Sequence, residues 1–140
     1  MDLTDPRAAL AIDHVGIAVR DLDAAIARAE SFVLAPVSRH RVDVQGVEEV
    51  MLPVGESFVQ YLCPLGPDTT VGRFLERRGE GLHHVAYRVA DLRAALDALH
   101  ADGVRLIDRE PRTGSEPGTL IAFVHPESNN GTLVELVQRD

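Results

Sequence analysis

Two stretches of the sequence repeat each other, and this repeat limits the folds open to the chain more than any other feature. Residues 13–19 match residues 83–89 without a gap, and each stretch is followed two residues later by Asp-Leu and an Ala-rich segment. The match places His14 opposite His84. Self-similarity of this kind is typical of a chain built from two related structural units.

Each copy has the pattern of one strand, one helix and three further strands. The run at residues 14–19 is short and apolar, as in a strand. Asp21 and Asp91 stand where a side chain accepts hydrogen bonds from the first N–H groups of a helix, and Gly103 ends the second such helix. The other expected elements are helices over residues 22–32, 71–78 and 92–100 and strands over residues 38–44, 47–53, 57–62, 105–109, 120–125 and 133–138.

This order predicts an α+β fold in which two tandem βαβββ modules, over about residues 11–65 and 81–140, form one cupped mixed sheet. A chain of 140 residues is about the size of one average domain, so we expect residues 1–140 to form a single domain.

Composition restricts the classes of partner. The formal net charge is −8, which disfavours a general attraction to nucleic acid or to an anionic membrane. Every basic residue is Arg, so an anionic ligand would need a local Arg cluster. No segment approaches the roughly 20 apolar residues of a membrane span, and the N-terminus lacks the pattern of a signal peptide. The single cysteine, Cys63, cannot form an internal disulfide, which fits a reducing compartment. We therefore expect a soluble, cytoplasmic protein.

Four polar residues interrupt strands that are otherwise apolar. His14 opens the first expected strand and His84 the fifth, whereas Gln60 and Glu135 lie within the last strand of each copy. In a repeated βαβββ sheet these strands meet across a pseudo-twofold axis, so their inward side chains can converge around a metal site. Two imidazoles, one amide oxygen and one carboxylate suit Co²⁺, Ni²⁺, Mn²⁺, Fe²⁺ or Zn²⁺.

Each of these residues also has a simpler interpretation when it is taken alone. A single strand histidine is commonly a core or surface residue, and Gln60 could face solvent on an alternating strand. Glu135 is harder to explain in this way, because a buried carboxylate without a cation is costly. Alternation turns His83 to the face opposite His84. The remaining histidines have no such partner and are interpreted as surface or structural: His40, His100 and His125.

The chain resembles the vicinal oxygen chelate (glyoxalase-like) superfamily and, within it, the methylmalonyl-CoA epimerases. The similarity runs from residue 12 to residue 138 and is strongest in residues 12–19, 45–49, 74–84, 121–126 and 131–136. It implies a metal-dependent isomerase that interconverts (2R)- and (2S)-methylmalonyl-CoA through an enolate. It also implies an octahedral divalent metal, most simply Co²⁺, whose protein ligands are His14, Gln60, His84 and Glu135.

The resemblance further implies two acid/base groups beside the substrate α-carbon, Glu49 and Glu135. A carboxylate near a metal tends to have a low pKa, so Glu49 is expected to be the main base and Glu135 mainly a ligand. Glu48 is the rival, since alternation lets only one of the two neighbours face the cavity, and the family spacing selects Glu49. An acyl-CoA thioester substrate and a homodimer are implied in the same way.

The sequence departs from the family pattern at several positions. Residues 27–36 lack the usual aromatic pair and Leu-Gly, and the loop at residues 114–119 is slightly longer than usual. Glu127 stands where Lys is common, which disfavours an anionic CoA tail at that point. The candidate phosphate contacts are Arg77, Arg78, Arg109 and Arg112.

Three alternatives share the fold. A glyoxalase I-like lyase acting on a hemithioacetal would explain the ligands but not Glu49 or the segment at residues 79–84. A ring-cleaving dioxygenase needs an open iron position that Gln60 would occupy. A metal-free resistance protein that sequesters a ligand would not bind a metal ion tightly.

Overall fold

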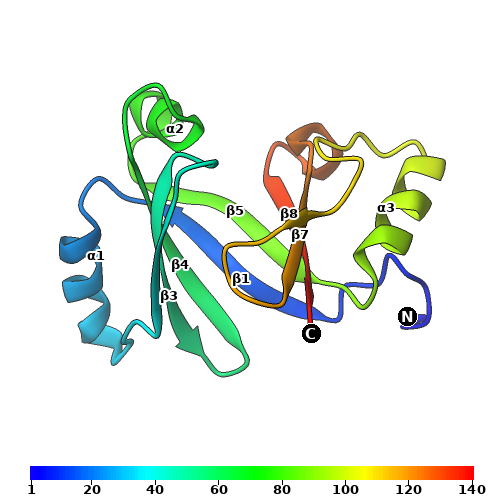
Figure 1. The fold of residues 1–140 in the computed structure, drawn as a ribbon, viewed down its shortest axis with the longest axis horizontal. Coiled ribbons are helices and arrows are strands. Elements are labelled where there is room, and N and C mark those ends of the chain that lie inside the picture. Colours follow the sequence, from blue (N-terminus) through cyan, green and yellow to red (C-terminus); the bar gives the residue numbers. More distant parts are fainter. The chain divides into compact units, whose positions relative to one another are not determined.

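The computed structural model describes residues 1–140, and its elements follow the two repeated copies (Figure 1). The first copy contains β1 (Ala11–Ala18), α1 (Leu22–Ala29), the 3₁₀ helix η1 (Glu30–Phe32), β2 (Ser38–Val42), β3 (Val47–Val54) and β4 (Ser57–Pro64). Helix α2 (Thr70–Arg78) follows it. The second copy contains β5 (Gly81–Arg88), α3 (Leu92–Ala101), β6 (Arg112–Thr113), β7 (Thr119–Val124), the 3₁₀ helix η2 (Pro126–Asn129) and β8 (Leu133–Arg139). The predicted α+β class and the two βαβββ modules are confirmed.

The chain divides into two compact units. The N-terminal unit is His14–His83, and the C-terminal unit combines Met1–Asp13 with His84–Asp140. Strands β1 and β5 therefore each begin in one unit and continue in the other. The expectation that residues 1–140 form a single domain stays a prediction.

The strands follow the same order in both units. The N-terminal unit has the order β2-β3-β4-β1, in which β4 is parallel to β1 and the other pairs are antiparallel. The C-terminal unit has the order β6-β7-β8-β5, in which β8 is parallel to β5. The register repeats as well, because Gly16 pairs with Gln60 and Ala86 pairs with Glu135. Gln60 and Glu135 are therefore equivalent positions of the two copies.

In each unit a helix covers one face of the strands (Figure 1). The predicted caps are present, since the carboxylates of Asp21 and Asp91 each accept a hydrogen bond at 3.0 Å from the backbone N–H three residues later. The apolar side of α1 packs on Val50 and Leu52 of β3. The apolar side of α3 packs on four residues of β7 and β8: Ala122, Val124, Val134 and Leu136. In each unit the helix therefore covers one face of the sheet, and the side chains on the opposite face do not contact that helix.

The predicted strand at residues 105–109 is wrong. Leu106 forms only an isolated bridge to Val124, and the edge strand is instead β6. The backbone N–H groups of Ile107 and Asp108 both donate to the carbonyl of Phe123, at 3.0 and 3.1 Å. Two successive donors on one acceptor break the alternation of a regular ladder, so the segment does not form a strand. Leu106 still packs on the core, whereas Ile107 is exposed.

The boundaries of other elements also differ from the prediction. Strands β1 and β5 begin three residues earlier than expected, so His14 and His84 lie inside their strands and do not open them. The first helix was predicted over residues 22–32, but α1 ends at Ala29 and a 3₁₀ turn occupies Glu30–Phe32. Val33 ends this turn in the left-handed conformation.

Replacing Val33 by Gly is expected to stabilise the protein. Val33 has φ 59° and a side chain that is 92% exposed, so the valine occupies a region unfavourable for β-branched residues and gains little from packing. Removing the Cβ relieves this strain, and after the entropy cost of Gly we expect a gain of about 0.5–1 kcal/mol, or a rise in Tm of about 2–4 °C. Asn130→Gly is the matched control, because Asn tolerates its φ of 54° and should gain less. An unchanged or lower Tm for Val33→Gly would contradict this explanation.

No helix of the structure is both long and apolar enough to cross a membrane.

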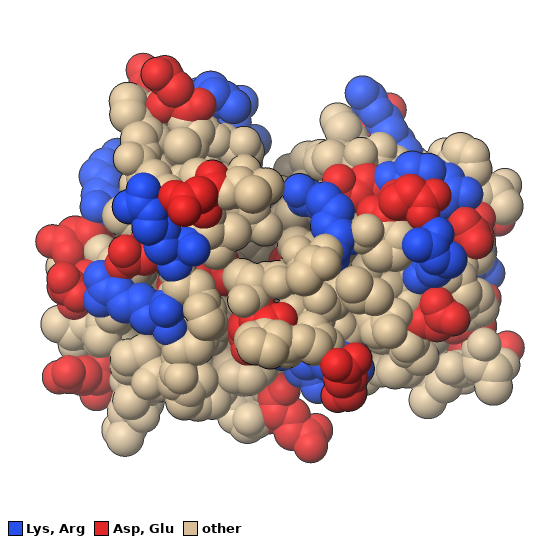
Figure 2. Space-filling view, viewed as in Figure 1, with Lys and Arg blue, Asp and Glu red and all other residues tan.

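Positively and negatively charged side chains lie next to each other on the surface. On the face shown in Figure 2, Arg atoms lie beside Asp and Glu atoms at most places. Ion pairs between exposed residues account for part of this mixing, such as Arg93 with Glu110 and Arg109 with Asp97. The positive charges are therefore largely balanced locally by carboxylates.

Cys63 is expected to react slowly with thiol reagents in the folded protein. Burial raises the pKa of its thiol, and the nearby carboxylates of Glu48 and Asp21 raise it further. The thiolate is the reactive form, so a raised pKa leaves less of it at pH 8. Iodoacetamide should label the native protein more slowly than the urea-unfolded chain at the same pH, as followed by mass spectrometry. Equal labelling rates would show that the folded environment does not protect the thiol.

Candidate functional site

Few polar or charged side chains are buried in this protein, and the predicted site residues are among them. The buried set is Asp13, His14, Glu49, Gln60, His84, Thr119 and Glu135. Burial of charged and amide groups is costly unless they are paired or bind a cation. The fold therefore sequesters all five residues that the sequence singled out.

In the N-terminal unit, His14, Gln60 and Glu49 share one sheet face. Gly16 pairs with Gln60 across β1 and β4, and His14 is two residues from Gly16, so the two side chains lie on the same side. Met51 pairs with Gln60 across β3 and β4, which places Glu49 on that side as well.

A hydrogen bond joins the Gln60 amide to the Glu49 carboxylate. The amide nitrogen Nε2 of Gln60 donates to Oε2 of Glu49 at 2.9 Å, and both side chains are buried. An ionised carboxylate only accepts hydrogen bonds, so the amide group must direct its NH₂ towards Glu49. The arrangement orients the Glu49 carboxylate and fixes which way the Gln60 amide faces.

The amide oxygen of Gln60 has no hydrogen-bond partner although it is fully buried. A buried acceptor without a partner costs free energy, commonly about 1–3 kcal/mol, and calls for an explanation. A bound cation supplies one, because amide oxygen is a ligand for divalent metals. This oxygen therefore has the chemistry and the burial of a metal ligand.

Glu48 and Glu49 face opposite sides of β3. Glu49 is 2% exposed, whereas the Glu48 side chain is 32% exposed and binds the guanidinium of Arg39 at 2.6 Å. Arg39 also binds Asp23 of α1 at 2.8 Å, and hydrogen bonds to both carboxylates raise its pKa. Glu48 therefore belongs to a surface ion-pair network on the helix side of the sheet, and Glu49 to the buried polar group.

Helix α2 packs on one end of the same face. Its residues Val71, Phe74 and Leu75 form an apolar cluster with Ala18 and Leu62 of the strands. His83 takes part in this packing from β5, since its imidazole meets the Phe74 ring edge-on at 4.9 Å. As the alternation of side chains predicted, His83 and His84 have different neighbours: His83 packs on Phe74, and His84 lies beside Glu135.

In the C-terminal unit, His84 and Glu135 lie together on the face opposite α3. Ala86 pairs with Glu135, and Nε2 of His84 lies 3.5 Å from Oε2 of Glu135. The ring of Phe123, which pairs with Glu135 across β7 and β8, meets the His84 imidazole edge-on at 6.0 Å. An imidazole nitrogen and a carboxylate oxygen are thus held side by side in a buried position beside an aromatic wall.

Each unit contributes two of the four predicted metal ligands. His14 and Gln60 belong to the N-terminal unit, and His84 and Glu135 to the C-terminal unit. The histidines and the carboxylate are buried groups of the kinds that hold metal ions. Two imidazoles, a carboxylate and an unsatisfied amide oxygen form a donor set that suits a divalent transition metal. That all four bind one ion stays a prediction.

The candidate phosphate contacts differ in their surroundings. Arg109 binds Asp97 of α3 at 2.9 Å, and the Arg78 guanidinium lies 5.8 Å from the Phe74 ring centre. Arg112 alone stands beside Phe123, at 5.6 Å from the ring centre. The remaining candidate, Arg77, is exposed on α2.

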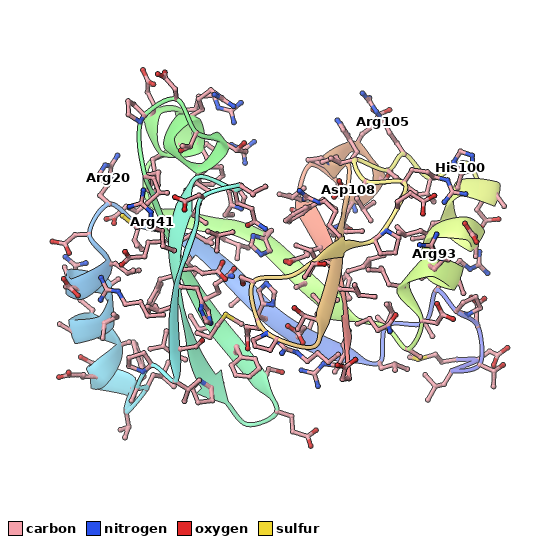
Figure 3. The ribbon with its side chains drawn as sticks, viewed as in Figure 1. Arg20, Arg41, Arg93, His100, Arg105 and Asp108 are labelled. Atoms are coloured by element: carbon pink, nitrogen blue, oxygen red, sulfur yellow. The ribbon has the colours of Figure 1, made fainter.

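Glu127, which the sequence marked as unfavourable for an anionic ligand, is paired with Arg105 at 2.6 Å. Its charge is therefore balanced, and both side chains are largely exposed. Arg105 points outward from the loop after α3 (Figure 3).

A buried ion cluster beside His14 was not predicted. The Asp13 carboxylate is fully buried and binds Arg88 at 2.9 Å and Arg139 at 2.6 Å. This pairing raises the pKa of Arg139 above its usual range. A charged residue within an apolar strand indicates in the sequence that Asp13 needs a partner. The sequence does not indicate which residues pair with it, because Arg88 and Arg139 lie far along the chain. The cluster ties β1 to β5 and β8 within the C-terminal unit.

Comparison with known proteins gives consistent matches over most of the chain. A family model described as the glyoxalase/bleomycin resistance protein/dioxygenase superfamily matches residues 13–123. The ethylmalonyl-CoA/methylmalonyl-CoA epimerase of Cereibacter sphaeroides is 36% identical over 130 residues, which cover 91% of this chain and 96% of that protein.

Two solved structures resemble the fold closely. A Ser-to-Thr variant of Streptomyces coelicolor methylmalonyl-CoA epimerase, in complex with 2-nitronate-propionyl-CoA, has a TM-score of 0.89 and 37% identity, with coverage of 94% of this chain and 96% of that one. A methylmalonyl-CoA epimerase in complex with methylmalonyl-CoA and NH₄⁺ has a TM-score of 0.86 and 38% identity, with coverage of 91% and 93%.

Proposed function

Because the chain belongs to the glyoxalase/bleomycin resistance protein/dioxygenase superfamily and, within it, to the methylmalonyl-CoA epimerases, we propose that it interconverts the (2R) and (2S) epimers of methylmalonyl-CoA. The observation that carries this proposal is the buried Glu49–Gln60 pair. It combines a carboxylate able to accept a proton with an amide oxygen that has no partner within the protein. Proton transfer at carbon requires a base such as the Glu49 carboxylate, and the Gln60 amide oxygen would help to hold the cation that stabilises the resulting anion.

His14, Gln60, His84 and Glu135 would hold the divalent metal, for which we propose Co²⁺ first. Such an ion acts as a Lewis acid and stabilises negative charge on oxygen atoms of a bound substrate. The unsatisfied amide oxygen of Gln60 supports this donor set, as does the 3.5 Å distance between the His84 imidazole and the Glu135 carboxylate.

Glu49 is the proposed base that removes the α-proton. The proton passes to the Glu49 carboxylate, and the electron pair of the C–H bond delocalises into the thioester carbonyl to give a planar enolate. The α-carbon stands between two carbonyl groups, which makes this proton unusually acidic. Gln60 donates to Oε2 of Glu49 and thereby holds the carboxylate in one orientation.

Return of a proton to the other face of the enolate completes the inversion. Glu135 is the proposed acid for this step, and we propose that it serves mainly as a metal ligand; its carboxylate lies 3.5 Å from His84 Nε2, which supports a shared role. Glu135 would enter this step protonated, and the reverse reaction exchanges the two roles. Before the next turnover in the same direction Glu49 releases its proton to water and Glu135 takes one up, so no proton is consumed overall and no oxidant is needed. The relatives act on acyl-CoA thioesters, and we extend this substrate class to the present chain together with a homodimeric assembly.

Separate incubations with two alternative substrates test the proposed function. Metal-loaded protein is incubated either with one epimer of methylmalonyl-CoA or with the hemithioacetal of methylglyoxal and glutathione. Loss of the optical purity of the first substrate, without conversion of the second, is the expected result. Conversion of only the hemithioacetal would replace the proposal by a glyoxalase I-like lyase, and tight binding without turnover of either would favour a ligand-sequestering protein.

A further inference from the structure

Arg112 lies on the sheet face of the C-terminal unit that carries His84 and Glu135. It pairs with Ile121 across β6 and β7, and Ile121 is two residues from Phe123, which pairs with Glu135. The guanidinium carbon of Arg112 is 5.6 Å from the centre of the Phe123 ring, and that ring meets the His84 imidazole at 6.0 Å. Arg112, Phe123 and His84 thus form a continuous row of side chains.

Asp108 holds the guanidinium in this position. Its Oδ2 accepts the backbone N–H of Phe123 at 2.9 Å and lies 3.2 Å from Nη2 of Arg112. The Asp108 side chain is 17% exposed and sits in the loop after α3 (Figure 3). Arg112 is therefore fixed by an ion pair at one nitrogen and by the aromatic ring below it. Its other N–H donors remain available, and its side chain is 42% exposed.

Four other Arg side chains of this unit have different partners. Arg88 and Arg139 bind the buried Asp13 carboxylate, and Arg105 binds Glu127. Arg109, only three residues before Arg112 and 45% exposed, binds Asp97 on the helix side. None of these four stacks on an aromatic ring beside a predicted ligand. The environment of Arg112 is that of a positioned donor, because a planar guanidinium held over a ring keeps its free edge for an oxyanion.

We infer that Arg112 is a specificity-determining residue that binds an anionic group of the substrate next to the Phe123 ring. This inference rests on the proposed function, which supplies a substrate rich in oxyanions. The net charge of −8 gives anions no general attraction, so a local cation that is held in place is needed. Carboxylates and phosphates both accept two parallel N–H bonds from a guanidinium, and the acyl carboxylate and the CoA phosphates are the two sources.

Binding measurements with three ligands test the inference and identify the source. Dissociation constants are measured by calorimetry for wild type, Arg112→Ala and Arg112→Lys with methylmalonyl-CoA, propionyl-CoA and methylmalonyl-pantetheine. Propionyl-CoA lacks the free carboxylate, and the pantetheine thioester lacks the phosphates. Arg112→Ala should weaken methylmalonyl-CoA binding by about 10- to 100-fold, the range expected for hydrogen bonds to charged groups. Arg112→Lys should lose less, since it keeps the charge but not the paired donors.

The pattern over the ligands assigns the contact. A loss that persists with propionyl-CoA and disappears with the pantetheine thioester assigns the phosphates. The opposite pattern assigns the acyl carboxylate. Arg93→Ala is the control, because Arg93 forms an exposed ion pair with Glu110. It should change each dissociation constant by less than about twofold, since exposed ion pairs contribute little. Circular dichroism and the Tm establish that each variant is folded.

Two results would overturn the inference. The first is that, with every ligand, Arg112→Ala and Arg112→Lys weaken binding no more than Arg93→Ala does. The second is that the wild type binds none of the ligands. A wild type that binds none of the ligands would overturn the proposed function as well, whereas the first result leaves the proposed function standing. If wild type binds acyl-CoA in an Arg112-dependent manner but does not change the configuration of methylmalonyl-CoA, the epimerase proposal fails and the inference stands.

Discussion

Replacing Glu49 by Gln is expected to slow the exchange of the methylmalonyl-CoA α-proton by roughly 10²–10⁴-fold, which is the usual contribution of a positioned general base. Gln has nearly the same shape as Glu and its side-chain oxygen can still accept the hydrogen bond from Gln60, so the fold should be retained. An amide cannot take up the proton. Proton NMR of the substrate in D₂O, with metal-loaded wild type and variant, measures the rate.

Glu48→Gln is the matched control for this experiment. Glu48 precedes Glu49 in β3, but it faces the other side and binds Arg39. We expect its removal to change the exchange rate by less than about twofold, since exposed ion pairs contribute little. Full activity of Glu49→Gln would move the role of the base to Glu135, and loss of activity in Glu48→Gln alone would reverse the assignment of the two neighbours.

Replacing His84 or Glu135 by Ala is expected to remove bound metal and, with it, the activity. Loss of a group that merely supports a metal ligand weakens affinity by about 10- to 100-fold, so loss of a ligand itself should exceed 100-fold. Elemental analysis of protein purified without a His-tag, after loading with Co²⁺ and gel filtration, measures the retained metal. Chelation of wild type should abolish activity, and Co²⁺ should restore it.

His83→Ala is the control for the ligand variants. His83 is adjacent to His84 and has the same chemistry, but its ring packs on Phe74. This variant should keep its metal while losing some stability through the lost ring contact. Unchanged metal content in both His84→Ala and Glu135→Ala would contradict the proposed ligand set, whatever their effect on the rate.

The repeat explains why so much of the fold could be predicted from one sequence. Two copies with the same strand-helix pattern fix both the number of elements and their pairing, and the register of the two parallel pairs makes Gln60 and Glu135 equivalent. Alternation along β3 then separates Glu48 from Glu49. These features depend on local periodicity, which a sequence displays directly.

Other features depend on contacts that periodicity does not encode. The segment with Leu106 and Ile107 has the composition of a strand, but its backbone donors converge on the carbonyl of Phe123. The stacking of Arg112 on Phe123 and the burial of Asp13 join residues that are distant in sequence. The hydrogen bond between Gln60 and Glu49, which leaves the amide oxygen unsatisfied, is also a tertiary contact and was found only in the structure.

One measurement tests the central claim most directly, namely the incorporation of deuterium at the α-carbon. One epimer of methylmalonyl-CoA is incubated in D₂O with Co²⁺-loaded wild-type protein, and mass spectrometry follows the mass increase of one unit while chiral analysis follows the configuration. The proposed mechanism requires complete exchange together with equilibration of the two epimers. No exchange with folded, metal-loaded protein would contradict it, because epimerisation through an enolate cannot proceed without release of this proton.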